Sequence, residues 1–221
     1  MKDRWDGKDL DLKMKGRGFI PRVINAFIFV KQQKLMVRIM RRCPDWVTPN
    51  RVTVFRMLLT APAIWLIAVH GWWWALVLTL SAAFLDFVDG WLAEAKGMKT
   101  RLGAILDPLA DKLFVIGICL TLALTAPLVW YWRVATTAVV LTELAIGAFR
   151  LLALKKKEKT AQEIIVAEWS GKLKMVIESL GIITITLGLA LSSAPAVTVG
   201  GILLASSIPF GLLSLLTKIA R

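Results

Sequence analysis

The sequence has few of the side chains on which many protein metal and redox sites depend. It contains one histidine, His70, and two cysteines, Cys43 and Cys119, which lie far apart in the chain. No disulfide or cysteine metal motif follows from that spacing, so both cysteines are expected to be ordinary packing residues. His70 ends an apolar segment next to Gly71, and we expect no catalytic role for it. The first eighteen residues are polar and charged, so no cleavable signal peptide is expected.

Acidic side chains are also scarce, whereas apolar ones are abundant. The 221 residues include 28 Lys and Arg but only 15 Asp and Glu, which gives a formal net charge of +13. Hydrophobic residues make up 57% of the chain, and its mean hydropathy is +0.67. That apolar content exceeds what a soluble domain of this size needs and predicts an integral membrane protein. Since the basic residues lie outside the apolar runs, we expect anionic membrane lipids as partners and no nucleic acid.

The apolar runs predict an all-α membrane fold with six transmembrane helices. Each run holds about twenty mostly apolar residues, the length that crosses a bilayer as a helix. Charged connections near residues 96–101 and 155–159 alternate with uncharged turns. Their positive charge predicts that both termini are cytoplasmic, in a bacterial inner membrane or its equivalent. The expected spans are residues 52–70, 73–92, 103–125, 128–153, 170–191 and 196–217.

Residues 1–44 precede these spans and are basic. Residues 1–18 mix both charge signs with glycines, and we expect them to form a mobile or loosely docked tail. Residues 19–42 interleave apolar and basic side chains, but their apolar run is too short to span a bilayer. They therefore predict an amphipathic helix lying in the cytoplasmic interface, with a solvated basic helix as the alternative. Pro44 ends this segment.

Four carboxylates stand at the cytoplasmic edges of the second and third predicted spans. An aspartate in the middle of a membrane helix costs roughly 2.5–3.5 kcal/mol, so a group of four needs compensation. Asp86 and Asp89 are three residues apart, and Asp107 and Asp111 are four apart, so each pair lies on one helix face. Two such pairs facing each other would make an all-oxygen site for a hard divalent cation, Mg²⁺ or Mn²⁺.

Two glycines adjoin these pairs. Gly90 follows the first pair and Gly103 precedes the second, so both helices present backbone without a side chain near the carboxylates. A bulky group such as a nucleotide would be able to approach such a backbone closely. A divalent metal, an open backbone and apolar surroundings indicate chemistry on a phosphate ester at the membrane surface.

The same stretch resembles the signature of the CDP-alcohol phosphatidyltransferases, D-x-x-D-G-x-x-A-R-x8-G-x3-D-x3-D. Glu94 stands where that family has arginine, and the other fixed positions match. The resemblance covers roughly residues 45–217 and implies a six-helix transferase domain over residues 45–221, often a homodimer, that acts on CDP-diacylglycerol and releases CMP. It also implies that the four aspartates hold the metal and that Asp111 is the general base. The matching positions are Asp86, Asp89, Gly90, Ala93, Gly103, Asp107 and Asp111.

A second segment, at the start of the first span, supports the same resemblance. Asn50, Thr53 and Arg56 follow one another at i, i+3 and i+6, on one helix face. The segment resembles the P-N-x-x-T-x-x-R stretch that accompanies the signature in relatives, which implies that these residues help to hold the cytidine and diphosphate. Gly90, Ala93 and Gly103 complete the expected nucleotide site. An ordinary helix start with proline in its first turn is the alternative.

Basic residues on the fourth and fifth spans indicate where an alcohol phosphate binds. Lys172 and Lys174 lie in a segment that resembles the W-x-G-K-x-K stretch of the phosphatidylglycerophosphate synthases. With Arg150 they are expected to form a pocket for the acceptor's phosphate. Alternatively, Arg150 pairs with Glu143, seven residues away on the same face, and the lysines extend to lipid headgroups. Glu178, four residues after Lys174, is expected to be its partner within the helix.

The preferred reaction is transfer of a phosphatidyl group from CDP-diacylglycerol to glycerol 3-phosphate, which gives phosphatidylglycerophosphate and CMP. Within the family, phosphatidylglycerol (a cardiolipin synthase) or another alcohol is the alternative acceptor. From other classes, the aspartates would also suit a divalent-cation transporter, and Glu94 would suit an inactive membrane scaffold. Thr142 stands where this lineage has an arginine before Glu143. Two positive charges expected near the phosphates are therefore absent.

Overall fold

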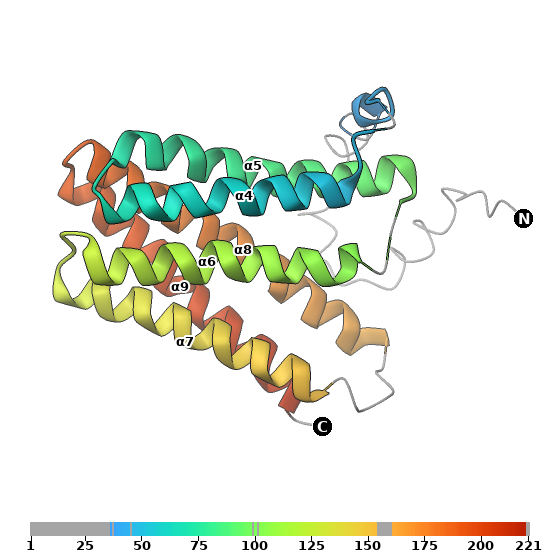
Figure 1. Ribbon diagram of the computed structural model, residues 1–221. Coiled ribbons are helices and arrows are strands. Elements are labelled where there is room, and N and C mark those ends of the chain that lie inside the picture. The colour runs from blue at the N-terminus through green and yellow to red at the C-terminus, as the bar shows by residue number, and fades with distance from the viewer. Residues whose placement is uncertain are drawn as a thin grey trace, which may run out of the picture.

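The computed structural model describes residues 36, 38–44, 46–98, 100, 102–153 and 161–219, and their regular elements are all helices (Figure 1). Side chains are described for these residues except 104, 149–153, 161–172 and 214–219. The long helices are α4 (Pro49–Ala68), α5 (Trp72–Lys96), α6 (Gly103–Thr125), α7 (Trp130–Ala153), α8 (Ala161–Ala190) and α9 (Ala194–Ile219).

The six long helices run alternately in opposite directions and close into a ring. Helix α4 packs between α5 and α6, α7 packs between α6 and α9, and α8 packs between α9 and α5. Contacts between α6 and α8 cross the middle of this ring. One end of the bundle, here called the turn end, carries the short turns at residues 69–71, 126–129 and 191–193 (Figure 1). The connection from α5 to α6 lies at the opposite end.

All six helices contribute apolar side chains to one core. These side chains come from the faces that the helices turn toward one another, and most of them are fully buried. Close packing in this core fixes the rotation of each helix about its own axis, which in turn fixes where the polar side chains nearer the α5–α6 connection point. Core members include Ile67, Ala75, Phe114, Ile118, Leu122, Val139, Ile182, Ile185 and Leu204.

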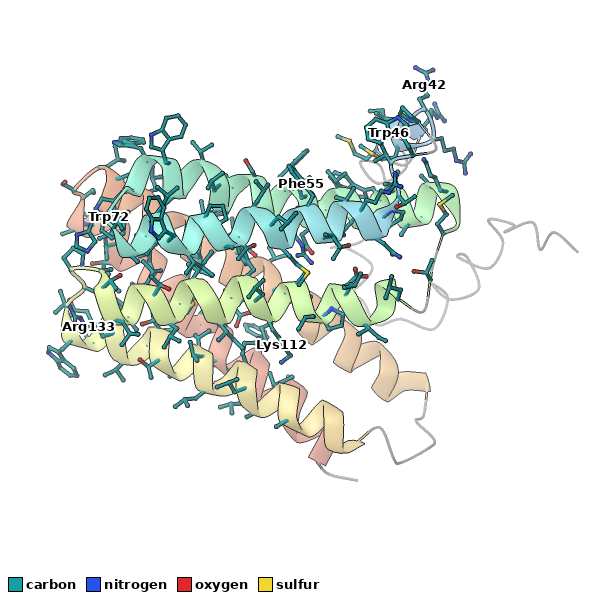
Figure 2. The ribbon with its side chains drawn as sticks, in the orientation of Figure 1. Arg42, Trp46, Phe55, Trp72, Lys112 and Arg133 are labelled. Carbon is teal, nitrogen blue, oxygen red and sulfur yellow. The ribbon has the colours of Figure 1, made fainter. Side chains whose placement is uncertain are left out.

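The outer surface of the bundle is apolar, as expected for a protein surrounded by lipid. Large apolar side chains such as Leu58, Phe84 and Ile105 are more than half exposed, and Figure 2 shows Phe55 of α4 pointing away from the bundle. In a soluble monomer such a surface would promote association. Exposed tryptophans at the turn end, Trp73 and Trp130 among them, are typical of the membrane–water interface. The chain is therefore an all-α, multi-pass membrane protein.

Five helices in the described ranges are long and apolar enough to cross a membrane, namely α4, α5, α6, α8 and α9. Helix α7 has 24 residues but also Arg133, Glu143 and several threonines, which lower its hydropathy. A helix of that length extends about 36 Å, which is long enough to cross a bilayer. The expected count of six spans stays a prediction on this point. The predicted interfacial helix at residues 19–42 lies largely outside the described residues, although residues 38–40 are helical.

Helices α8 and α9 approach each other at backbone distance. A Cβ added at Gly200 would lie 2.6 Å from the backbone nitrogen of Ile185, and one at Gly181 would lie 2.9 Å from that of Leu204. Gly188 makes the same kind of contact with Val197. Small residues that allow such close approach are a common device for packing helices in membranes.

We expect Gly200→Ala to destabilise the protein by about 1–3 kcal/mol, because the added methyl group collides with the backbone of α8. Away from such a contact, the same change in a helix would be stabilising by about 1 kcal/mol. Thermal unfolding in detergent measures the difference. Ser206→Ala is the control, since Ser206 is exposed on α9 and its hydroxyl bonds only to the carbonyl oxygen of Leu203. A stabilised Gly200→Ala protein would contradict the close contact.

Candidate active site

The four predicted aspartates come together around side chains from α4. Asp86 and Asp89 lie in the last turns of α5, and Asp107 and Asp111 lie in the first turns of α6. Gly97 ends α5 with the left-handed backbone (φ +63°) that favours glycine, and α6 begins at Gly103. Because α4 packs against both helices, its inward face lies opposite both carboxylate pairs.

Arg56 of α4 is the centre of this cluster. Its side chain is 3% exposed, and its Nη1 donates to Asp86 Oδ1 and, over 3.0 Å, to Asp111 Oδ1. Its Nε lies 4.0 Å from Asp89 Oδ2. Within the described part of the chain, Nε and Nη2 are buried without a hydrogen-bond partner. Such unpaired donors are costly unless a ligand uses them, so Arg56 is ready to bind an anionic group.

Thr53, one turn earlier on the same face of α4, links the other two carboxylates. The hydroxyl oxygen Oγ1 is buried and lies 3.1 Å from Asp89 Oδ2 and 3.1 Å from Asp107 Oδ1. The carbonyl oxygen of Pro49 is equally close, at 3.1 Å. A hydroxyl has one proton to donate, so it serves these three acceptors in turn.

Asn50 holds the connection between α5 and α6. Its Oδ1 accepts a hydrogen bond from the hydroxyl of Thr100 (3.1 Å), and that hydroxyl accepts one from the backbone N–H of Gly103 (3.0 Å). A Cβ at Gly103 would lie 2.9 Å from Asn50 Oδ1, so this glycine makes room for Asn50. Gly90 differs, because it is exposed and an added Cβ would meet nothing within 4 Å. Only Gly90 therefore offers the open backbone that the sequence suggested for both glycines.

The cluster opens to the surface on one side. The side chains of Asp86 and Asp111 are 30% and 25% exposed, and Asp107 is exposed, whereas Asp89 is buried. A small pocket extends inward from Arg56, Asp86 and Asp111. Its remaining walls are mainly apolar side chains of α5, α6 and α8, including Phe114 and Met175. A polar ligand bound at Arg56, Asp86 and Asp111 would thus have apolar side chains on its inner side.

The charges of this cluster do not balance. Among the described side chains, four carboxylates face one guanidinium, a formal surplus of three negative charges. All-oxygen donors with surplus negative charge suit Mg²⁺ or Mn²⁺, so the donor set fits such an ion. In the arrangement described, no three acidic, histidine or cysteine side chains of the described residues are grouped closely enough to hold one. Arg56 and Thr53 lie between the carboxylates, so an ion would share the oxygen atoms that these two side chains contact.

A second buried cluster joins α7, α8 and α9. Lys174 of α8 is ion-paired with Glu143 of α7 and, over 2.9 Å, with Glu178 of its own helix. Glu178 also accepts a hydrogen bond from Ser207 of α9 (3.2 Å). The expected pairing of Lys174 with Glu178 is confirmed. The ammonium group of Lys174 already has two carboxylate partners, so a phosphate bound to Lys174 would compete with Glu143 and Glu178.

The other two residues of the expected acceptor pocket, Arg150 and Lys172, have side chains outside the described part of the structure. The alternative pairing of Arg150 with Glu143 is equally undescribed. Lys112 of α6 was not singled out from the sequence, yet its Nζ donates to the backbone carbonyl oxygen of Glu143 over 2.8 Å. In the sequence, only its position directly after Asp111 pointed to Lys112. Its contact with α7 depends on how α6 and α7 are rotated about their axes, which the sequence does not show.

The two departures from the family signature lie in different surroundings. Glu94 is exposed on the last turns of α5, away from the buried guanidinium. Lys96, which follows it, donates to the carbonyl oxygens of Pro44 and Val47 over 2.7 and 2.9 Å. Thr142 is half-buried and its hydroxyl bonds to the carbonyl oxygen of Ala138 in its own helix. Among the described residues, neither Glu94 nor Thr142 is hydrogen-bonded to a member of the aspartate cluster.

Several proteins are similar to this chain over part of its length. A probable phosphatidylglycerophosphate synthase from Mycobacterium tuberculosis is 32% identical over 109 residues, which cover 49% of this chain and 47% of that protein. A CDP-diacylglycerol–glycerol-3-phosphate 3-phosphatidyltransferase from Cereibacter sphaeroides is 42% identical over 77 residues, 33% of this chain and 34% of that one. The corresponding protein of Blochmanniella floridana is 29% identical over 143 residues, 62% and 72% of the two chains. The chain thus spans about half the length of the first relative.

A solved structure has the same fold. The apo crystal structure of Mycobacterium tuberculosis phosphatidylinositol phosphate synthase superposes with a TM-score of 0.52 at 18% identity. The superposition covers 86% of this chain and 94% of that one. The family model described as CDP-alcohol phosphatidyltransferase matches residues 46–213, from the residues before α4 to the last turns of α9. Because that match includes both carboxylate pairs and most of the chain, the protein belongs to the CDP-alcohol phosphatidyltransferase family.

Proposed function

We propose that this protein transfers a phosphatidyl group from CDP-diacylglycerol to glycerol 3-phosphate, forming phosphatidylglycerophosphate and CMP. The relatives from C. sphaeroides and B. floridana are named for this reaction. The observation that carries the proposal is Arg56, a buried guanidinium inside a cluster of four carboxylates, two of whose nitrogens have no hydrogen-bond partner among the described residues. That arrangement offers donors to a phosphate and, beside them, oxygen ligands and a base.

Asp111 is the proposed general base. The acceptor's hydroxyl oxygen forms a bond to the phosphorus of the phosphatidyl group, the bond from that phosphorus to the CMP oxygen breaks, and the proton goes to the Asp111 carboxylate. Arg56 holds Asp111 through Nη1 and keeps one carboxylate oxygen directed at the cluster. Phe114 and Val115, in the pocket wall, exclude water from one side of the site.

A divalent cation, Mg²⁺ or Mn²⁺, is the proposed cofactor. It would be held by Asp86, Asp89, Asp107 and Asp111, whose surplus negative charge attracts it. When bound, such an ion neutralises charge on the diphosphate and makes CMP a better leaving group. The chain's own contribution is to gather these oxygens from two helices around α4.

The nucleotide is proposed to lie along α4 and the end of α5. Arg56 contacts the diphosphate through its unpaired nitrogens, and exposed Gly90 lets the nucleotide approach α5 closely. Ala93 is one turn further along the same helix. Three further residues support this surface. Asn50 bonds to Thr100 in the α5–α6 connection, and Gly103 leaves room for Asn50. Thr53 contacts the carboxylate of Asp89.

The acceptor's phosphate is proposed to bind Arg150, Lys172 and Lys174. Of these, Arg150 and Lys172 are the primary contacts in this proposal, because a phosphate at Lys174 would compete with Glu143 and Glu178. The site is proposed to face the cytoplasm, with both termini on that side, in a chain of six spans that forms a homodimer. Residues 1–44 form a basic tail and interfacial helix, and residues 45–221 form the transferase domain, close to the matched range of 46–213.

Release of CMP tests this function directly. Purified protein with CDP-diacylglycerol and Mn²⁺ is expected to release CMP when glycerol 3-phosphate is added, and to release less with glycerol, inositol phosphate or phosphatidylglycerol. Turnover with phosphatidylglycerol would indicate a cardiolipin synthase. Flux of Mn²⁺ into liposomes without CMP release would indicate a transporter, and neither activity would indicate an inactive scaffold.

Lys172→Met is expected to raise the KM for glycerol 3-phosphate about tenfold or more, because a charged hydrogen bond to phosphate is lost. Initial rates of CMP release over a range of acceptor concentrations measure it. The matched control uses the same variant with an acceptor that has no free phosphate, for which KM is expected to stay unchanged. Equal increases for both acceptors would argue against a phosphate contact at Lys172.

A further inference from the structure

Lys112 and Asp111 are neighbours in sequence but face different helices. Consecutive residues of a helix point about 100° apart, so one rotation of α6 sets both directions. Asp111 faces Arg56 on α4, whereas Lys112 faces α7. Figure 2 shows the Lys112 side chain between α6 and α7. Lys112 Nζ donates to the backbone carbonyl oxygen of Glu143 (2.8 Å) and lies 3.6 Å from Glu143 Oε2.

Gly147 makes this contact possible. It lies one turn after Glu143, on the side of α7 where Lys112 arrives. A Cβ at Gly147 would collide with Lys112 Nζ and lie 3.1 Å from its Cε. The lysine stem therefore rests against bare backbone, and a side chain at position 147 would require the end of the Lys112 side chain to shift from its present place.

Among the residues whose side chains are described, the charges of the cluster that Lys112 joins balance. It contains two lysines, Lys112 and Lys174, and two glutamates, Glu143 and Glu178. Lys174 and Glu178 are almost fully buried, and Ser207 completes the hydrogen bonding of Glu178. The aspartate cluster, by contrast, has a surplus of three negative charges. Buried ion pairs between these side chains hold α6, α7, α8 and α9 in one arrangement.

We propose that Lys112 is a positioning residue, which anchors α6 to the glycine-opened turn of α7 and thereby directs Asp111 and Asp107 toward α4. In this arrangement Gly147 provides the space that the end of Lys112 occupies. Glu143 connects Lys112 to Lys174, which in turn pairs with Glu178. The kinetic part of this inference rests on the proposed function. Its structural part, that Lys112 and Gly147 act as one unit on the aspartate cluster, does not.

Two variants and their combination test the anchor. Lys112→Ala removes the ammonium group, and Gly147→Ala adds a methyl group that displaces it without changing any charge. Each is expected to lower kcat for CMP release on the order of ten- to a hundredfold, because a small misplacement of reacting groups has effects of that size. The KM for glycerol 3-phosphate is expected to stay within about twofold, since Lys112 is not proposed to touch the acceptor.

The double variant distinguishes an anchor from two independent defects. Once Lys112 is replaced by alanine, the methyl group at position 147 has nothing to collide with, so the double variant is expected to match Lys112→Ala alone. Multiplied losses, an unchanged kcat in both single variants, or a raised acceptor KM at constant kcat would overturn the proposal. Thr137→Ala is the control, since Thr137 is exposed on α7 and bonds only to its own helix at Arg133.

A second readout does not depend on catalysis. The affinity of the aspartate cluster for Mn²⁺ is measured in each variant by titration, with the free ion detected by electron paramagnetic resonance. We expect several-fold weaker binding in Lys112→Ala and in Gly147→Ala, again without further loss in the double variant. Wild-type affinity in both single variants would overturn the anchor. Absence of CMP release by the wild-type protein would overturn the proposed function and leave this comparison of Mn²⁺ affinities intact.

Discussion

Replacing Asp111 by asparagine is expected to slow CMP release by roughly 10²–10⁴-fold, the usual contribution of a general base. Asparagine has nearly the same shape, and its amide oxygen is able to accept the hydrogen bond from Arg56 Nη1 that Asp111 Oδ1 accepts. It is unable to take a proton from the acceptor's hydroxyl. Single-turnover mixing of the protein, CDP-diacylglycerol and Mn²⁺ with glycerol 3-phosphate measures the rate of the chemical step.

The matched control for this variant is Glu94→Gln. It makes the same change from carboxylate to amide at an exposed position of α5 that lies outside the aspartate cluster. Its rate is expected to stay within about twofold of the wild-type rate, in line with the small effects of most surface substitutions. If Asp111→Asn kept more than a tenth of the wild-type rate at an unchanged melting temperature, Asp111 would not be the base.

Arg56→Met is expected to destabilise the protein by about 3–5 kcal/mol, the cost of leaving a buried ionic partner unpaired. Arg56 is the cation that contacts Asp86 and Asp111 and lies near Asp89, so its loss leaves these carboxylates to repel one another. For a chain of this length the melting temperature is expected to fall by roughly 6–20 °C. Thermal unfolding in detergent with a chelator present measures the fall.

Arg51→Met provides the comparison for Arg56. Arg51 is exposed in the same helix, and its Nη1 donates only to the carbonyl oxygen of Trp46 among the contacts described (2.7 Å), so its loss is expected to cost less than about 1 kcal/mol. Adding Mn²⁺ is expected to recover part of the stability of Arg56→Met, because the ion supplies positive charge to the same oxygens. Equal destabilisation by both substitutions would show that the arginine has no special relation to the carboxylates.

The helices could be predicted because membrane helices are long apolar runs. The third expected span, residues 103–125, coincides with α6, and the first differs from α4 by a few residues at each end. Helix α8 begins at Ala161, well before the expected residue 170. The reason is that a helix continues past the edge of the bilayer as long as its residues favour helix, and polarity alone does not end it.

The gathering of the two aspartate pairs could also be predicted, since their spacing of three and four residues places each pair on one helix face. The partner between them could not. Arg56 was expected to bind nucleotide, and its contact with Asp86 and Asp111 depends on how α4 is rotated between α5 and α6. In the same way, the i,i+4 pairing of Lys174 with Glu178 was readable from sequence, whereas its pairing with Glu143 on another helix was not.

The turn end of the bundle is held by hydrogen bonds that cross between helices. His70 lies with its ring nitrogen Nε2 3.0 Å from the carbonyl oxygen of Thr125, and its ring stacks on Trp72 at 5.1 Å. Arg133 donates to the carbonyl oxygens of Ala126 and Leu128, over 3.1 Å in each case, and Figure 2 shows Arg133 and Trp72 together at this end. Connections this short resist separation of the helices they join. We therefore expect the helices to separate more readily at the opposite end, where the acyl chains of the proposed lipid substrate enter between them.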